Sequence, residues 1–249
     1  MEFFDCNCFI GCPSNCMLRP VLSADALIGE MDRSGIAKAA VWHVAQRDYS
    51  ELVGNDLLAQ ALAGRTDGRL VGCWSILPDQ TGEMPVDDQF FSQMAQANVR
   101  LLRVHPNHNF LLRGEVAGRL LEQITARRIP IILSCGHVTW PNMYDLLAEF
   151  PELTAIVADL GCWGSDRWFR PLIERYPNVC IEISQYILDA GIEAFVQSYG
   201  PRRMLFGSGF PEYDHGGMML SLRHAEIDDD AKSLIAGGNF ERMIAEARI

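Results

Sequence analysis

The sequence predicts an α/β fold, a single-domain (β/α)8 TIM barrel spanning residues 1–249. Two observations lead to this fold. Eight short apolar or β-branched runs recur at wide spacing, and the stretches between them carry apolar residues at helical intervals. Eight such strand–helix units in about 250 residues is the usual size of this barrel. Its active site lies at the carboxyl ends of the strands, so polar residues at those ends are the functional candidates.

The expected strands are short runs of β-branched and other apolar residues, several of them bounded by Gly or Pro. In chain order they are residues 2–9, 38–44, 70–77, 99–105, 129–136, 153–161, 179–184 and 203–209. Because they alternate with helical stretches throughout, the sequence favours parallel strands joined by crossover helices.

Helices are expected between consecutive strands. The first has apolar positions at 26, 27 and 31, and the fourth at 120, 121 and 124. Ser23 is placed to cap the first helix and Gly35 to end it, while Pro130 separates the fourth helix from the next strand. We find no linker, repeat or low-complexity tract.

A doubly wound open sheet is the structural alternative to the barrel. Such folds carry a Gly-rich phosphate-binding turn after the first strand. Here Gly11 is followed by Cys12, Pro13 and Ser14, so that turn is missing and the barrel is preferred.

Composition narrows the partners. The formal charge of −11 comes without a basic block, which disfavours nucleic acid and anionic membranes and favours a small-molecule substrate. No apolar run reaches the roughly 18 residues of a spanning helix, and the N-terminus lacks signal-peptide features. We therefore expect a soluble, cytoplasmic protein, with a homo-oligomer left open. In that compartment the 8 cysteines are expected to stay reduced, so a disulfide scaffold is not expected.

Five stretches in order resemble the amidohydrolase superfamily, in its branch of amidohydrolase-related TIM-barrel hydrolases and decarboxylases. That branch opens with Asp-x-His-x-His-x-Gly, and Asp5, Asn7, Phe9 and Gly11 fall in those places. The other four stretches, which resemble its fifth, sixth and eighth strands and its closing helix, are PIILSCG, IVADLG, LFGSGFP and LIAGGNFERMI. The resemblance covers nearly the whole chain and implies the barrel independently.

The resemblance also implies one or two divalent metals, bound by histidines on strands one, five and six and an aspartate on strand eight. This chain has Asn7, Phe9, Ser134, Asp159 and Gly209 at those positions. Only Asp159 is a strong ligand, whereas a tetrahedral zinc site needs three or four such donors. We therefore expect no catalytic metal and no other cofactor.

Four residues near strand ends form the predicted catalytic set. Arg103 and His105 lie two apart on the fourth strand and so share a face. Arg103 suits a substrate carboxylate or a developing oxyanion, or alternatively pairs internally with Asp159 or Glu182. Asp159 or His105 is the predicted general base. Ser134 is predicted to donate a hydrogen bond; a nucleophilic role would require a histidine between it and the aspartate, which this strand order lacks.

Five further residues are predicted to bind substrate: Asn7, His43, Trp74, His137 and Glu182. The structural alternative is that both histidines are hydrogen-bonded parts of the barrel and that Trp74, like Trp163, packs in the core. His108 is expected in a loop, and His215 and His224 on the surface of a helix.

The cysteines allow a separate site. Alternation along the first strand would point Cys6 and Cys8 outward against the helices, in a packing role. Cys12, Cys16, Cys135 and Cys162 fall in loops over the barrel mouth. An iron–sulfur cluster on Cys8, Cys12 and Cys16 is an alternative, although it needs exposed thiolates.

Together these features predict a metal-independent hydrolase acting on a small carboxylated lactone or activated ester. The resemblance includes the 2-pyrone-4,6-dicarboxylate lactonases, which are understood to need no metal. The alternative is a non-catalytic barrel, a pseudoenzyme that binds a ligand or partner. A filled mouth would favour the pseudoenzyme, and an open polar mouth would favour the hydrolase.

Overall fold

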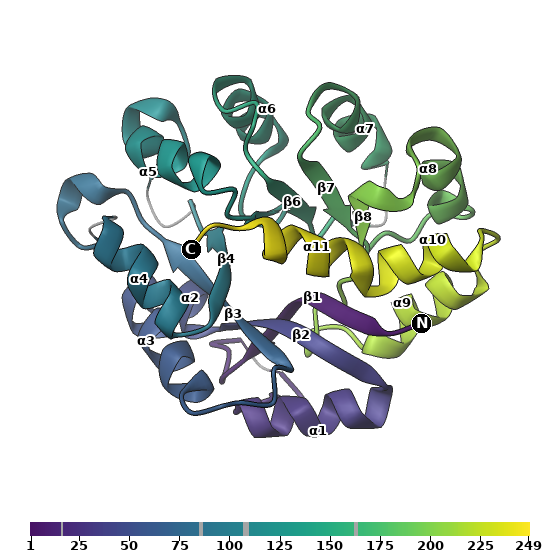
Figure 1. Ribbon diagram of the computed structural model, residues 1–249, viewed down its shortest axis with the longest axis horizontal. Coiled ribbons are helices and arrows are strands. Elements are labelled where there is room, and N and C mark those ends of the chain that lie inside the picture. The colour runs from purple at the N-terminus through teal and green to yellow at the C-terminus, as the bar shows by residue number, and fades with distance from the viewer. Residues whose placement is uncertain (16, 85–86, 107–109, 162–163) are drawn as a thin grey trace.

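The computed structural model describes residues 1–15, 17–84, 87–106, 110–161 and 164–249. Eight parallel strands follow one another in chain order around a barrel, as predicted (Figure 1). They are β1 (Phe3–Ile10), β2 (Ile36–His43), β3 (Leu70–Ile76), β4 (Val99–Val104), β5 (Ile131–Ser134), β6 (Ala155–Ala158), β7 (Val179–Glu182) and β8 (Met204–Leu205).

Helices surround the barrel in the order that the periodicity predicts (Figure 1). They are α1 (Ala24–Ser34), α2 (Ala45–Asp48), α3 (Glu51–Leu62), α4 (Asp88–Gln96), α5 (Gly114–Ala126), α6 (Trp140–Glu149), α7 (Asp166–Arg175), α8 (Gly191–Tyr199), α9 (His215–His224), α10 (Asp229–Ser233) and α11 (Asn239–Glu246). Short helical turns add η1 (Asp79–Thr81), η2 (Pro201–Arg203) and η3 (Leu234–Gly238). Within the described ranges, no helix combines the length and apolar character needed to cross a membrane.

The predicted ends of α1 are confirmed. The Ser23 hydroxyl accepts a hydrogen bond from the Ala26 amide at 3.2 Å, which satisfies one of the free N–H groups of the first turn. Gly35 ends the helix in the left-handed region at φ +79°, and its amide donates to the Met31 carbonyl.

The barrel closes between β1 and the segment that follows β8. The Cys6 amide donates to the Phe206 carbonyl at 3.0 Å, and the Gly209 amide donates to the Asn7 carbonyl at 3.0 Å. Between Asp5 and Cys8, β1 carries one residue more than the facing part of β2, because Asp5 pairs with Ala39 and Cys8 with Val41. This insertion is a β-bulge.

The bulge corrects one prediction. Cys6 does not point outward but lies in the barrel interior, packed with Phe4, Ile156 and Leu205. Cys8 does pack outside the barrel, as predicted, because the extra residue restores the alternation. Asn7 and Phe9 then both reach the cavity at the carboxyl end of the strands.

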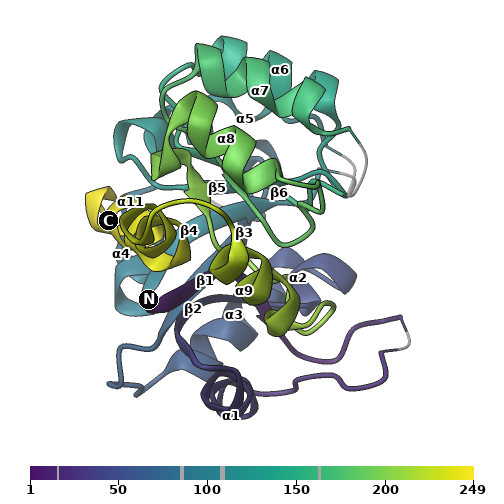
Figure 2. The same ribbon diagram turned by 90° about the vertical axis from the view of Figure 1, so that its right-hand side faces the viewer.

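The opposite end of the barrel is closed by α11, which lies across the amino ends of the strands (Figures 1 and 2). Phe240 packs edge-on against Phe4 with ring centroids 4.7 Å apart. The buried Asn239 amide donates to the Met204 and Pro201 carbonyls at 3.0 and 2.8 Å, which ties the helix to the start of β8. Only the carboxyl end therefore remains open for a site.

Candidate functional site

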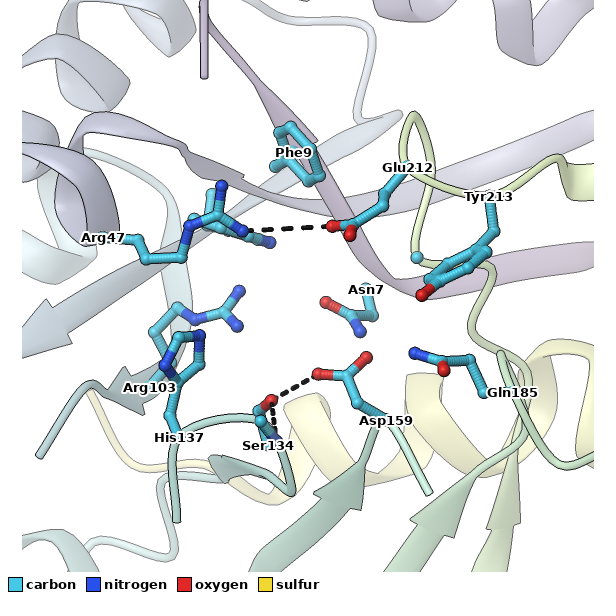
Figure 3. Close-up of a pocket in the computed structure, with 13 residues that line it drawn as sticks. Asn7, Phe9, Arg47, Arg103, Ser134, His137, Asp159, Gln185, Glu212 and Tyr213 are labelled. Atoms are coloured by element: carbon cyan, nitrogen blue, oxygen red, sulfur yellow. Dashed lines mark hydrogen bonds and ion pairs between the residues drawn. The ribbon is translucent and has the colours of Figure 1, made fainter. Parts of the chain in front are cut away.

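A polar cavity of about 220 Å³ lies at the carboxyl end of the strands. Two arginines and His137 lie on one side of it, Asp159 and Gln185 on the other, and Asn7 between them (Figure 3). Of the nine predicted site residues, the cavity is lined by Asn7, Arg103, Ser134, His137 and Asp159. The cavity thus sets cationic and anionic groups opposite each other.

Arg103 is held at the end of β4, where register with β3 and β5 turns its side chain into the barrel. Its side chain is only 3% exposed, and the guanidinium carbon lies 3.8 Å from the centroid of the Trp42 ring. Among the described residues, none accepts a hydrogen bond from its Nε or Nη1. Burial lowers the pKa of this guanidinium, so an anionic partner is the group that it lacks.

Arg47 is the second cation at the cavity, and the strand-end reasoning missed it. It comes from the short helix α2, directly after β2, and its Nε donates to Asp48 Oδ1 at 2.7 Å. Its Nη1 lies 3.9 Å from Glu212 Oε2 across the mouth. The guanidinium also lies 5.9 Å from the centroid of the Phe9 ring.

Asp159 faces the arginines across the cavity (Figure 3). Its Oδ2 accepts a hydrogen bond from the Ser134 hydroxyl, which itself accepts one from the Gly136 amide at 3.2 Å. The Asp159 backbone has φ +56°, an unusual left-handed conformation directly after β6. Strained backbone of this kind often accompanies a function, since it persists only where the surroundings enforce it.

Glu182 is buried behind Asp159 rather than in the cavity. Its Oε1 accepts hydrogen bonds from the Asp159 amide at 2.9 Å and the Ser184 hydroxyl at 2.6 Å. Burial, and next the charge of Asp159, raise the pKa of Glu182 to about 7. This acid therefore supports the backbone of Asp159 and does not line the cavity.

The two predicted histidines that follow β4 and β5 differ in their position relative to the cavity. His137 lines the cavity, whereas His105 is fully buried beneath it and does not. His105 Nδ1 lies 3.1 Å from the Ser75 hydroxyl, and its ring meets the His137 ring edge-on with centroids 4.9 Å apart. Since His105 is away from the cavity, Asp159 is the better placed of the two predicted bases.

His43 and Trp74 also lie away from this cavity. His43 Nδ1 accepts a hydrogen bond from the Ala45 amide at 3.2 Å, and burial lowers the pKa of the imidazole. Trp74 is on the outer side of β3, where its ring packs on Phe90 with centroids 5.7 Å apart. Their surroundings agree with the structural alternative for both residues.

The loops add three residues that sequence reasoning missed. Gln185 follows β7, and Glu212 and Tyr213 follow β8; all three line the cavity.

His215 was predicted on the surface of a helix, and the structure corrects this. It is 1% exposed, at the start of α9, and its ring stacks on Phe210 with centroids 4.0 Å apart.

The loop cysteines do not gather into a described site. Cys12 is exposed, whereas Cys8 is fully buried on the outer face of β1, so these two thiols occupy different environments. Burial raises the pKa of Cys135 to about 12, and among the described residues Cys135 belongs to no cluster of His, Cys and carboxylate donors. Cys16 and Cys162 lie outside the described residues, as do His108 and Trp163.

Comparison with known proteins decides the family. The sequence matches the family model described as amidohydrolase over residues 13–244, almost its whole length. The chain belongs to the amidohydrolase family. This membership confirms the resemblance that the strand-end motifs indicated. A search of curated proteins returned no match.

Solved structures share the amidohydrolase barrel at low identity. An uncharacterised TIM-barrel protein from Bordetella bronchiseptica is 18% identical, with 99% of each chain covered and a TM-score of 0.72. For 2,6-dihydroxybenzoate decarboxylase from Rhizobium the values are 14%, 98% of each chain and 0.74. For a Pseudomonas putida protein assigned as a 2-pyrone-4,6-dicarboxylic acid hydrolase they are 14%, 98% of each chain and 0.72. At these identities the likeness establishes the fold alone.

The side chains at the positions where the resemblance implies metal ligands do not make a comparable donor set. Phe9 presents an apolar ring packed on Trp42 at 4.9 Å between centroids, and Gly209 has no side chain. Asn7 and Ser134 are neutral donors, which leaves Asp159 as the one carboxylate. One strong ligand does not fit the three or four that a zinc site requires. We therefore derive no chemical step through a metal at this cavity.

Proposed function

We propose that this amidohydrolase family member hydrolyses a lactone or activated ester of a small carboxylated substrate, without a catalytic metal. The observation that carries the proposal is Arg103, a buried cation whose Nε and Nη1 have no acceptor among the described residues. It faces Asp159 across a cavity large enough for a small molecule (Figure 3). A desolvated guanidinium aimed into a cavity is suited to an anion.

The two arginines lie at different depths in the cavity, and we assign them different roles. Arg47 lies nearer the mouth, with its side chain 20% exposed, and is placed to pair with the substrate carboxylate. Arg103 lies deeper, where low polarity strengthens its attraction for the negative charge that develops on the carbonyl oxygen. The roles resemble those of an anchor and an oxyanion hole.

Asp159 is the proposed general base. It takes a proton from water as the water oxygen bonds to the carbonyl carbon, and the tetrahedral intermediate then expels the ring or leaving-group oxygen. Asp159 returns the proton to that oxygen, so the reaction consumes one water. The Ser134 hydroxyl and the Glu182–backbone contact hold the carboxylate in place. Lactones and enol esters suit this scheme, because their carbonyls need no Lewis acid to react.

The structural relatives support an anionic substrate. The named activities of two of them, a dihydroxybenzoate decarboxylase and a pyrone dicarboxylic acid hydrolase, concern carboxylated compounds. The open polar cavity also favours the hydrolase over the pseudoenzyme, for which a filled mouth is expected. Binding without catalysis remains the competing function, and decarboxylation is the competing reaction.

The proposal is tested on a panel of carboxylated lactones, activated esters and hydroxybenzoates, assayed with a chelator present. Hydrolysis is expected for lactones or esters that carry a free carboxylate. It is not expected for the same compounds with that carboxylate methylated. Arg103→Met and Asp159→Asn are each expected to lower kcat/KM by about 100-fold or more. Arg119→Met, which removes an exposed charge on α5, is the matched control and keeps full activity.

Three results would overturn parts of this proposal. Activity that vanishes with chelator and returns with a divalent ion would make catalysis metal-dependent. Release of CO₂ instead of water uptake would make the protein a decarboxylase. Tight binding of carboxylates with no turnover by the wild type would leave a pseudoenzyme.

A further inference from the structure

Three metal-binding side chains meet outside the barrel, away from the proposed catalytic cavity. They are Asp5 and Cys8 on β1 and His215 at the start of α9, and each is at most 1% exposed. Cys8 Sγ lies 4.0 Å from His215 Nε2, which lies 3.7 Å from Asp5 Oδ2. All three donor atoms are within 4.8 Å of one another, and within the described ranges this is the one such group of His, Cys and carboxylate donors.

The donors match a zinc site in kind, and two of the three distances between them are close to those of a zinc site. Carboxylate oxygen, thiolate sulfur and imidazole nitrogen are the three donor types that Zn²⁺ binds in proteins. Bonds of about 2.0–2.3 Å at tetrahedral angles put neighbouring donors about 3.3–3.6 Å apart. The observed 3.7 and 4.0 Å are longer by only a few tenths of an ångström, which small side-chain movements can supply.

Asp5 carries the second observation, which points independently to a cation. Its Oδ1 accepts hydrogen bonds from the Asn7 and Ser208 amides, each at 3.0 Å. Its Oδ2 is fully buried, has no hydrogen-bond partner among the described residues and is directed at His215. A separation of 3.7 Å is too long for a hydrogen bond, so this carboxylate oxygen lacks the compensation that burial demands.

We propose that Asp5, Cys8 and His215 form a structural zinc site behind the barrel wall. Binding deprotonates the Cys8 thiol and releases that proton to solvent. The buried Ser208 hydroxyl, 3.9 Å from Cys8 Sγ, lies beside the site as the nearest further oxygen.

The site has a structural consequence for the cavity. Residues 209–214 are the last part of the segment between β8 and α9, and they carry Glu212 and Tyr213 into the cavity. A metal bridging His215 to β1 fixes the far end of this segment, whose near end is held by the Gly209 amide on the Asn7 carbonyl. The ion stabilises the fold and takes no part in the reaction, so the proposal stands apart from the proposed function.

Cobalt is the probe for this site. Chelator-treated full-length protein is titrated with Co²⁺, and the expected result is one equivalent bound with thiolate-to-cobalt charge-transfer absorption in the near ultraviolet. Cys8→Ala is expected to abolish that band and His215→Gln to weaken Co²⁺ binding at least tenfold. Cys6→Ala, a buried thiol facing the barrel interior, is the matched control and keeps the band.

Stability gives a second readout. Zn²⁺ is expected to raise the Tm of the wild type and of Cys6→Ala by several degrees and to leave Cys8→Ala unchanged. Absence of the band, its persistence in Cys8→Ala, or a Zn²⁺-insensitive wild-type Tm would overturn the proposal. If Cys8→Ala fails to fold, Cys8→Ser and His215→Gln decide by the same two readouts. If Cys8→Ala still hydrolyses lactones, the proposed function holds even where the zinc-site proposal is overturned.

Discussion

At the residue scale, Glu182 makes a prediction about pH. Its pKa is raised to about 7 in the folded protein, chiefly by burial, so the folded state holds this proton more tightly than the unfolded chain. The resulting stability is present below the ordinary carboxyl pKa and is lost as pH rises through about 7. Its size is on the order of 3 kcal/mol. We expect the free energy of unfolding to fall between pH 5 and pH 8, as measured by urea titration.

Glu182→Gln isolates this contribution. The variant is less stable than the wild type at pH 5, since an amide NH2 cannot accept the hydrogen bond that the Ser184 amide now donates at 2.8 Å. Its stability should nevertheless vary less between pH 5 and pH 8 than that of the wild type. Glu122→Gln, on the exposed face of α5, serves as the control with an unchanged pH profile. Parallel profiles for the wild type and Glu182→Gln would contradict the prediction.

Some residues of the site could be predicted from the sequence and others could not. Arg103, Ser134 and Asp159 could be predicted, because each stands at or just past the carboxyl end of a strand. Glu212 and Tyr213 could not, because they enter the cavity through the path of a loop, which strand periodicity does not encode. For His215 the prediction of a surface position was wrong. Its helix starts against β1, and this tertiary packing, which the local sequence does not show, buries its first residue.

At the element scale, the strands were predictable and the bulge in β1 was not. Each strand is a short buried run between helical stretches, and this pattern is local in sequence. The bulge depends on pairing with β2, about 34 positions away, and with residues 206–210, about 200 positions away. That is why alternation placed Cys6 on the wrong side of β1.

At the element scale, a prediction concerns Gly207, in the segment that follows β8. A methyl group on Gly207 would stand 2.2 Å from Glu182 Oε2 and 3.3 Å from Cys6 Sγ, so the close approach of this segment to β7 requires glycine. Gly207→Ala should destabilise the protein by about 1–3 kcal/mol through overpacking. It should also lower hydrolytic activity, because the displaced Glu182 holds the Asp159 backbone.

The control is a glycine that has room. Gly29 lies within α1, and a methyl group there meets nothing within 4 Å. Gly29→Ala should therefore stabilise the helix by about 0.5–1 kcal/mol and leave activity unchanged. Equal urea midpoints for the two variants would show that the contact at Gly207 relaxes without cost.

At the scale of the whole molecule, the two ends of the barrel have separate tasks. The carboxyl end holds the cavity, while α11 covers the amino end with Phe240 and Met243 against the interior cluster. Interior side chains such as Ile132 and Ile156 fill the space between the two ends. Changes at the amino end should therefore alter stability and leave the chemistry of folded molecules intact.

Phe240→Ala tests this division of tasks. Phe240 is fully buried against Phe4, so truncation should lower the free energy of unfolding by about 3–5 kcal/mol, with a smaller loss for Phe240→Leu. Leu220→Ala, at an exposed position on α9, should stay within about 0.5 kcal/mol of the wild type. Below its own unfolding midpoint, where most molecules are folded, Phe240→Ala should keep the wild-type KM. A raised KM would mean that packing under α11 is transmitted along the strands to Arg103 and Asp159, and that the barrel behaves as one coupled unit.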